Sequence, residues 1–420
     1  MKKSQAIAYI ARFVGVGLTF LLSTFLARAL GAEDFGTYSF LLALIMLLTL
    51  PTQSALPIIA LRDAAKNNCK EGKNILSEST KKIIHISTIY GLGLAISTIV
   101  LSHFYTFPDV DDWLVYSLSP LFIIIPLSLL YSSIFRGCGN LLISMIPEYV
   151  IKPLATMVLV LSFYLTFSVI DLYLAAVSTV ISSSAIVIFY GIFLKKNTKF
   201  EKSNSNDYNF KQVFNLSIIS GGQVIFANIE VFFLGILSEV TQVGIFKVAL
   251  VISLLIIFSQ TVINQIIQPD IVRKYQNNDL IGLQNIIKRS SLIIVSLGAF
   301  IFFVIMIIGQ DLIAFFYGNE YRSSYYILLI LSCGQIINMA FGSVGTILNM
   351  TKNESYAVKP MLFTVVSNIA LDLVLIHFYG AYGAAVAAVV STLLWNVLLR
   401  NQVLKRTGIE SSGLVLLFKG

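Results

Sequence analysis

The chain carries little charge for its length. Lys, Arg, Asp and Glu make up only 12% of its 420 residues, whereas soluble domains contain roughly 25% charged residues. Hydrophobic residues make up 57% of the sequence, and the mean hydropathy is +0.84. This composition excludes an ordinary soluble domain and predicts an integral membrane protein.

Residues that commonly carry catalysis or bind metals are also scarce. The three cysteines, Cys69, Cys138 and Cys333, lack the spacing of a metal site, so we expect reduced thiols. The three histidines are scattered, and no glycine-rich phosphate loop is followed by Lys and Ser or Thr. We therefore expect no catalytic residue, no metal ion and no cofactor, and the sequence does not indicate an enzyme.

Long apolar runs dominate the sequence instead. About 20 consecutive apolar residues cross the hydrocarbon core of a bilayer as a helix, and we predict twelve such spans. They are residues 6–30, 38–61, 83–104, 114–135, 144–167, 172–194, 212–237, 243–268, 290–309, 324–348, 356–378 and 383–404. The predicted fold is all-α. Segment 278–289 has an amphipathic pattern and is expected to lie on the membrane surface.

Basic residues fall in alternate connections between these spans. The odd-numbered connections contain a single basic residue, Arg322, beside the acids Glu33, Asp34, Asp109, Asp111, Asp112, Asp171, Glu239, Asp311 and Glu320. The other connections hold the lysines and arginines, so the positive-inside rule places both termini in the cytoplasm. The same distribution argues against a nucleic-acid partner despite the net charge of +8.

The span pattern occurs twice along the chain. Residues 172–182 (LYLAAVSTVIS) and 381–391 (AYGAAVAAVVS) match at six of eleven positions without a gap. We predict an N-lobe at 1–194 (spans 1–6), a flexible cytoplasmic linker at 195–211 and a C-lobe at 212–420 (spans 7–12). Two copies with an even number of spans share one orientation, an arrangement typical of transporters.

Ionisable residues inside spans are the first functional candidates, because a charge in the bilayer costs at least ~2.5 kcal/mol on insertion scales. Seven such residues occur: Arg12, Arg28, Glu148, Lys152, Glu230, Lys247 and Asp372. Two of them, Arg28 and Lys247, lie close enough to helix ends to extend toward water instead. Glu148 and Lys152 are four residues apart and could simply neutralise each other.

Glycines occupy equivalent places in spans 1 and 7. Span 1 contains Gly15 and Gly17, and span 7 contains Gly221 and Gly222. Glycine allows bending and close helix approach, so these four residues are candidate hinges. The alternative is that they are ordinary membrane-helix glycines.

Three motifs carry a family resemblance. Residues 26–38 (LARALGAEDFGTY), 316–321 (FYGNEY) and 136–140 (RGCGN) resemble signatures of polysaccharide-biosynthesis flippases. On these motifs the chain resembles a Wzx-type O-antigen flippase of the multidrug/oligosaccharidyl-lipid/polysaccharide exporter superfamily. The resemblance extends over residues 6–405.

The resemblance implies two six-helix lobes around a central cavity walled largely by spans 1, 2, 7 and 8. It also implies a substrate of undecaprenyl-diphosphate-linked oligosaccharide. We expect this substrate to move from the cytoplasmic to the outer leaflet by alternating access, coupled to an H⁺ or Na⁺ gradient. The expected location is the bacterial cytoplasmic (inner) membrane. The expected partners are this substrate, membrane lipid, and other O-antigen assembly proteins such as a polymerase and a chain-length regulator.

Roles for the candidates follow from this substrate. Arginine and lysine hold phosphate, so the predicted substrate-binding residues are Arg12, Arg28, Lys247 and Lys152. The predicted ion-coupling residues are Glu230, Asp372 and Glu148. Tyr9 and Asn228 are expected to meet the sugars.

Three alternatives remain open. One is a cation-coupled exporter of amphipathic small molecules with the same fold, although that activity favours a cavity rich in acids and aromatics. Another is a membrane-embedded O-antigen polymerase, which the short outer loops and the repeat argue against. The third is a flippase for lipid II or another lipid-linked glycan, which differs only in its sugar.

Overall fold

The chain is helical almost throughout. The computed structural model describes residues 3–66, 74–104, 111–167, 170–201 and 210–412. In these ranges ten helices are long and apolar enough to cross a membrane. The prediction of a helical membrane protein is therefore confirmed, whereas the orientation of the termini stays a prediction.

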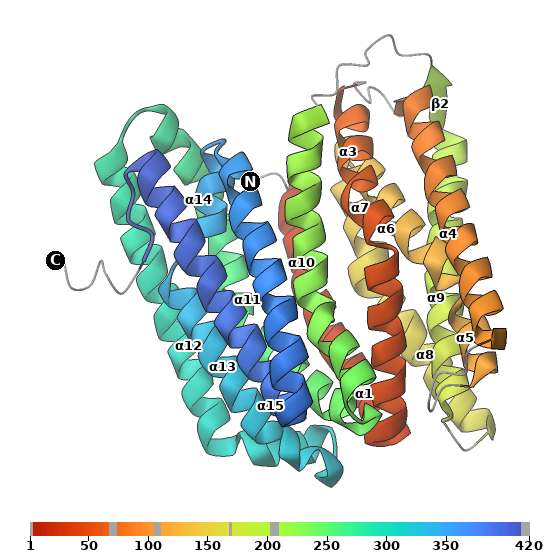
Figure 1. Ribbon diagram of the computed structural model, residues 1–420. Coiled ribbons are helices and arrows are strands. Elements are labelled where there is room, and N and C mark those ends of the chain that lie inside the picture. The colour runs from red at the N-terminus through yellow and green to blue at the C-terminus, as the bar shows by residue number, and fades with distance from the viewer. Residues whose placement is uncertain (1–2, 67–73, 105–110, 168–169, 202–209, 413–420) are drawn as a thin grey trace. The chain divides into compact units, whose positions relative to one another are not determined.

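The chain forms two compact units, residues 1–224 and 225–420. The elements of the first unit are α1 (Lys3–Leu48), α2 (Leu50–Ser54), α3 (Leu56–Lys66), β1 (Asn74–Ser77), α4 (Glu78–Phe104), α5 (Asp112–Leu118), α6 (Leu121–Gly137), α7 (Leu141–Ile146), the π-helical turn η1 (Pro147–Ile151), α8 (Lys152–Phe167), α9 (Leu172–Asn197) and β2 (Thr198–Glu201) (Figure 1).

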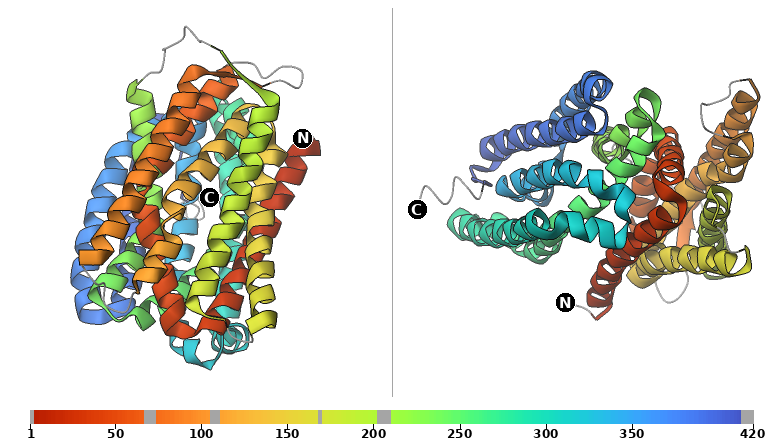
Figure 2. Two further views of the ribbon diagram at one scale, coloured as in Figure 1. Left: turned by 90° about the vertical axis from the view of Figure 1, so that its right-hand side faces the viewer. Right: turned by 90° about the horizontal axis from the view of Figure 1, so that it is seen from below.

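Helix α10 (Phe210–Leu237) begins in the first unit and ends in the second. The remaining elements are α11 (Val240–Gln276), α12 (Leu280–Phe316), the 3₁₀ turn η2 (Asn319–Ser323), α13 (Ser324–Ala340), α14 (Val344–Met350), the 3₁₀ turn η3 (Glu354–Ala357) and α15 (Val358–Thr407). Figure 2 gives two further views of these elements. The predicted boundaries of the lobes and linker stay a prediction.

One glycine interrupts each of the helices α1 and α15. Gly31 has φ 80° and ψ 174°, and Gly380 has φ 53° and ψ −132°. Positive φ is readily adopted by glycine because it has no Cβ. Predicted spans 1 and 2 lie on either side of Gly31, and spans 11 and 12 on either side of Gly380. The count of twelve spans stays a prediction, and these two interruptions are compatible with it.

Proline explains the irregular turn in predicted span 5. The turn η1 begins at Pro147, and the N–H of Lys152 donates to the carbonyl of Pro147, five residues back. Pro153 has no N–H to donate, so the regular four-residue pattern cannot continue through this position. A π-turn of this kind changes the angular spacing of the residues around it.

Two short strands depart from the predicted all-α fold. β1 and β2 pair in parallel, with Asn74 opposite Thr198 and Ser77 opposite Glu201. The prediction was wrong here because apolar periodicity does not reveal four-residue strands that pair across a long stretch of sequence. Strand β2 also lies inside the predicted flexible linker, so that part of 195–211 has regular structure.

A buried acid fixes β1 and α4 to α3. Asp63 is 3% exposed, and its Oδ2 accepts hydrogen bonds from Ser77 Oγ at 2.5 Å and from the Thr80 hydroxyl. A buried carboxylate needs such donors because desolvation without them is costly. The contacts hold this end of the first unit in one arrangement.

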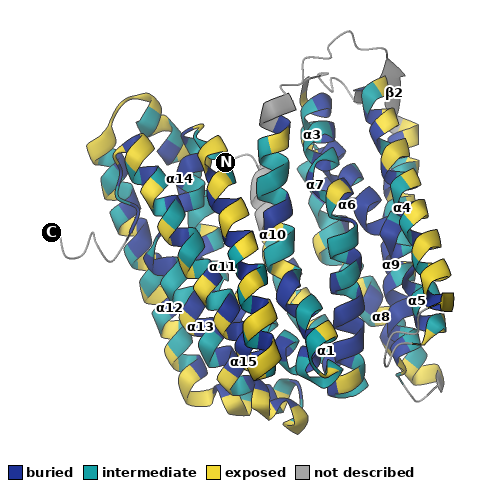
Figure 3. Cartoon of the chain, in the orientation of Figure 1, coloured by how far each residue is buried: buried dark blue, intermediate teal, exposed yellow. Residues whose placement is uncertain are grey.

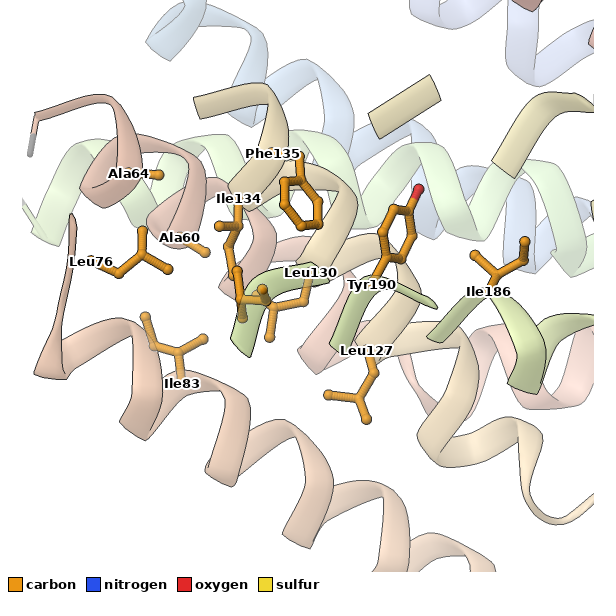
Figure 4. Close-up of a cluster of buried hydrophobic side chains, with 11 residues drawn as sticks. Ala60, Ala64, Leu76, Ile83, Leu127, Leu130, Ile134, Phe135, Ile186 and Tyr190 are labelled. Atoms are coloured by element: carbon orange, nitrogen blue, oxygen red, sulfur yellow. The ribbon is translucent and has the colours of Figure 1, made fainter. Parts of the chain in front are cut away.

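The apolar core of the first unit gathers side chains from α3, β1, α4, α6 and α9. Figure 4 shows Ala60, Ile83, Leu130, Ile134 and Tyr190 within this cluster. Small alanines on α3 permit the close approach of α6. Tyr190 buries its hydroxyl by donating to the Ser144 carbonyl at 2.9 Å.

The outer faces of the helices are apolar as well. Phe104 is 85% exposed, Ile307 76% and Phe300 68%, and exposed residues follow the outward sides of α4 and α12 in Figure 3. Such extensive exposed apolar surface would be unfavourable in water. It fits helices whose outer faces contact lipid.

In the second unit, α13 packs against α11, α12 and α15. Helix α12 runs without interruption from Leu280 to Phe316. Segment 278–289 is therefore not a separate surface helix, because its helical part continues directly into predicted span 9. Asp279 caps this helix by accepting from the Gly282 N–H at 2.8 Å and from Lys274 Nζ at 2.7 Å. Lys274 and the Gly282 N–H hold the pKa of Asp279 below its ordinary value.

An ion pair fastens the segment after α15. Arg400 donates to both carboxylate oxygens of Glu410, at 2.8 and 2.6 Å. The Gln284 side chain donates through Nε2 to the Glu410 carbonyl at 2.7 Å and accepts from the Glu410 N–H through Oε1 at 3.0 Å. The segment following α15 is thus anchored to both α15 and α12. Bidentate charged hydrogen bonds are among the stronger polar contacts in proteins.

We expect Glu410→Gln to lower the thermal stability of the purified protein. The change removes the carboxylate and leaves Arg400 without its charged partner, which costs about 1–3 kcal/mol. Its control is Asp270→Asn, which breaks an exposed pair with Arg273 and costs about 0–1 kcal/mol. Melting temperatures in detergent test the difference, and equal shifts would refute the anchoring role of Glu410.

Candidate functional site

Two of the predicted ion-coupling residues lie together in the second unit. Glu230 on α10 is 5% exposed, and Asp372 on α15 is 0% exposed. The charge of Glu230 acts on Asp372, and the Asn368 side chain also approaches Glu230. Asn368 and Asp372 are four residues apart, so they share one face of α15.

The polar side-chain atoms of Asp372 and Asn368 are buried without hydrogen-bond partners in the described part of the chain. Neither oxygen of Asp372 forms a hydrogen bond in the described part of the chain, and neither does the oxygen or the nitrogen of the Asn368 amide. Buried polar groups are satisfied in the great majority of cases, and a buried charge needs neutralisation. Asp372, Asn368 and Glu230 thus supply several buried oxygens that a small cation or a proton could neutralise.

A pocket of about 200 Å³ lies beside this cluster, within the second unit. We call it the acid pocket, since Glu230 lines it. Phe226, Phe246 and Trp395 supply aromatic walls, and Ser391 adds a buried hydroxyl that has no hydrogen-bond partner among the described residues. The pocket provides space next to the carboxylate in an otherwise apolar surrounding.

In the first unit, Arg12 contacts an aromatic ring. Its guanidinium carbon lies 5.7 Å from the centroid of the Tyr149 ring, within the range of a cation–π contact. Tyr149 belongs to the π-helical turn η1, and Gly15 follows Arg12 by three residues on α1. A Cβ added at Gly15 would lie 2.6 Å from both the Tyr149 Cβ and its carbonyl oxygen. The absence of a side chain at Gly15 therefore permits the close packing of α1 against η1.

The other candidate hinges differ from Gly15. A Cβ at Gly17 would meet nothing within 4 Å, and one at Gly221 would meet ordinary contacts with Leu50 and Ser54. Gly222 is buried. Helix α1 stays helical through Gly15 and Gly17, and its non-helical residue is Gly31. A hinge role for the four predicted glycines stays a prediction.

Glu148 also lies in the π-helical turn. Its Oε1 is buried without a hydrogen-bond partner, and its charge reaches the phenol of Tyr190. No ion pair joins Glu148 to Lys152, both of which the structure describes.

The remaining basic candidates, Arg28 and Lys247, lie on α1 and α11. Arg28 is exposed on α1, three residues before Gly31, and Lys247 is half-buried on α11. Arg12 and Arg28 are about 24 Å apart along α1, at a rise of ~1.5 Å per residue. One diphosphate cannot touch both at once. The role of these residues in binding stays a prediction.

Comparison with solved structures finds the same fold in a multidrug transporter and in a lipid II flippase. The MATE multidrug transporter DinF-BH aligns with TM-score 0.70 over 98% of this chain and 97% of that chain, at 16% identity. Lipid II flippase MurJ, in an inward closed conformation, aligns with TM-score 0.68 over 95% of this chain and 87% of that chain, at 15% identity.

The sequence defines the family more narrowly. Residues 2–269 match the family described as polysaccharide biosynthesis protein. The chain belongs to this family. It is also 26% identical over 407 residues to the probable low-salt glycan biosynthesis flippase Agl15 of Haloferax volcanii, covering 95% of this chain and 82% of that protein.

Proposed function

We propose that the protein translocates a lipid-linked oligosaccharide across the membrane by alternating access. Membership of the polysaccharide biosynthesis family carries this proposal, and similarity to a probable glycan flippase supports it. The proposed substrate is undecaprenyl-diphosphate bearing an O-antigen unit or related glycan, moved from the cytoplasmic to the outer leaflet of a bacterial inner membrane. We propose no catalytic step.

The basic residues would bind the diphosphate one after another during its passage. Because Arg12 and Arg28 are about 24 Å apart on one helix, they would bind the headgroup at different stages of its passage. Arginine suits this role because its guanidinium donates two parallel hydrogen bonds to phosphate. Lys247 on α11 and Lys152 on α8 are the further proposed contacts.

The acids would couple transport to an ion gradient. Glu230 and Asp372 are buried and lack a basic partner in the described part of the chain. Uptake of a proton or Na⁺ would relieve the repulsion between them, and release on the other side of the membrane would restore it. Glu148 in the first unit is the further proposed coupling residue.

Deletion of the gene in its host tests the proposed function. We expect complete lipid-linked units to accumulate in the cytoplasmic leaflet, measured by leaflet-resolved analysis, with surface glycan lost until the gene is restored. Units that reach the outer leaflet but stay unpolymerised would indicate the polymerase. Unchanged glycan together with lost drug efflux would indicate the exporter, whose fold the MATE similarity also fits.

Arg12→Ala and Arg28→Ala are expected to reduce surface glycan without reducing protein abundance. Losing a charged hydrogen bond to phosphate costs about 2 kcal/mol, or roughly a 30-fold loss of affinity. The matched control is Arg273→Ala, which removes an exposed arginine that pairs with Asp270. Quantification of surface glycan at equal membrane abundance checks the result. Normal glycan with both variants would remove them from the binding path.

A further inference from the structure

A second pocket in the second unit is lined by amides. It has a volume of about 210 Å³ and lies among α11, α13, α14 and the second half of α15. We call it the amide pocket, after Gln260, Asn264, Asn338 and Asn396, which line it. It is much larger than the ~30 Å³ that one water molecule occupies in the liquid. Nothing in the proposed handling of the diphosphate or the coupling ion uses it.

Hydrogen bonds between the amides fix their positions. Asn396 Nδ2 donates to Asn338 Oδ1 at 2.8 Å, and Asn338 Nδ2 approaches Gln260 Oε1 at 3.4 Å. Gln260 Nε2 donates to the Gly342 carbonyl at 3.2 Å. The chain of bonds ends on a backbone carbonyl, so the amide groups form a preorganised wall rather than independent flexible side chains.

Other polar groups in the pocket remain available to a ligand. Asn264 accepts from the Ser343 hydroxyl through Oδ1, but its Nδ2 donates no hydrogen bond among the described residues. The Thr346 hydroxyl likewise forms no hydrogen bond among the described residues. A Cβ at Gly345 would meet nothing within 4 Å, so the pocket is open beside this glycine.

The lining of the pocket determines which chemistry fits. No charged residue among the described ones lines it, and one side is the indole of Trp395. A phosphate or a metal cation would find no opposite charge there. Amides offer both donors and acceptors, which pair with the hydroxyl groups of a sugar. The flat apolar face of an indole covers the C–H face of a sugar ring.

We propose that the amide pocket binds a sugar of the transported glycan. This inference rests on the proposed flippase function and adds a glycan-binding subsite in the second unit. The expected sugar contact Asn228 does not line this pocket, and the side chain of the other expected contact, Tyr9, lies outside the described residues. Trp395 also lines the acid pocket, together with Glu230. A sugar that stacks on this indole would therefore contact a residue that both pockets share.

Tryptophan fluorescence provides a direct test, because the chain has only two tryptophans. Trp113→Phe removes the exposed one and leaves Trp395 as the only reporter. The probe is the host's own oligosaccharide, released from its lipid carrier by mild acid and added to purified protein. We expect a saturable change in Trp395 fluorescence. Inorganic diphosphate, the second probe, should give no change.

Variants of the pocket sharpen this test. In the Trp113→Phe background, the nearly isosteric Thr346→Val removes only the unused hydroxyl, and Asn264→Ala removes the unused amide nitrogen together with the oxygen that accepts from Ser343. We expect either to weaken binding of the oligosaccharide by roughly fivefold, as expected for one hydrogen bond. The control is Asn349→Ala, an exposed amide on α14 outside the pocket. Absence of a fluorescence change in the parent protein, or equal affinities for all variants, would overturn the proposal.

A complementation assay separates this inference from the proposed function. If the unmodified gene restores glycan flipping in the deletion strain and Thr346→Val restores it at the same rate, the flippase stands and the sugar subsite fails. If deletion leaves flipping intact, the proposed function itself fails. We expect the unmodified gene to restore flipping fully and Thr346→Val to restore it more slowly at equal protein abundance.

Discussion

Gly15→Ala is expected to destabilise the first unit and to reduce transport. The added Cβ would lie 2.6 Å from both the Cβ and the carbonyl oxygen of Tyr149, so α1 must move away from η1. Overpacking of this kind costs about 1–3 kcal/mol. The movement would also displace Arg12 from its position over the Tyr149 ring. Thermal melting in detergent and glycan complementation at equal abundance measure the two effects.

Gly17→Ala is the matched control on the same helix. A Cβ at Gly17 meets nothing within 4 Å, and alanine is favoured over glycine in a helix by about 1 kcal/mol. Its melting temperature should therefore be unchanged or higher. If both substitutions impair transport equally and neither lowers stability, flexibility of α1 rather than close packing is the property that matters.

The helical pattern was predictable because the bilayer imposes it. Apolar runs of membrane-spanning length leave little choice but helix, and all twelve predicted spans fall on helical segments. Helix α1 contains predicted span 1 and the first part of predicted span 2, with the non-helical Gly31 between them. Strands β1 and β2 were unpredictable because neighbours far apart in sequence create them.

The candidate site was predictable only in part. The position of an acid inside an apolar span indicated Glu230 and Asp372 as functional candidates. In the structure they lie close enough for the charge of Glu230 to act on Asp372. Asn368 was not predicted because an uncharged amide inside a span does not stand out as an ionisable side chain does. Its position four residues before Asp372, on the same helical face, was the available signal.

The amides of the second pocket were missed for a different reason. Gln260, Asn338 and Asn396 lie on α11, α13 and α15, far apart along the chain. Only packing of α13 against α11 and α15 brings them into one hydrogen-bonded row. Each one alone resembles an isolated polar residue in a membrane helix.

Asp372→Asn is expected to abolish coupling without harming the fold. The amide has nearly the shape of the carboxylate but cannot carry its negative charge, and the Asp372 side chain is 0% exposed with no hydrogen-bond partner among the described residues. Relief of buried, repelling charge is neutral or stabilising, so the melting temperature in cation-free buffer should not fall. Translocation of lipid-linked oligosaccharide in proteoliposomes should lose its dependence on the imposed H⁺ or Na⁺ gradient. Glu230→Gln should act in the same way.

The control for these variants is Asp270→Asn, which changes an exposed acid paired with Arg273 and should leave gradient dependence intact. If Asp372→Asn and Glu230→Gln respond to both gradients as the unmodified protein does, the acids do not couple transport.

Stability measurements can also identify the ion. A cation that binds only the folded protein stabilises it by about 2.7 kcal/mol at a hundred times its Kd. If Na⁺ is the coupling ion, NaCl should raise the melting temperature more than choline chloride does, and Asp372→Asn should abolish that difference. If equal salt effects accompany retained dependence on a proton gradient, the acids exchange protons instead. A buried pair of carboxylates without a basic partner can be neutralised in either way, and the two ions differ in whether adding salt at constant pH stabilises the fold.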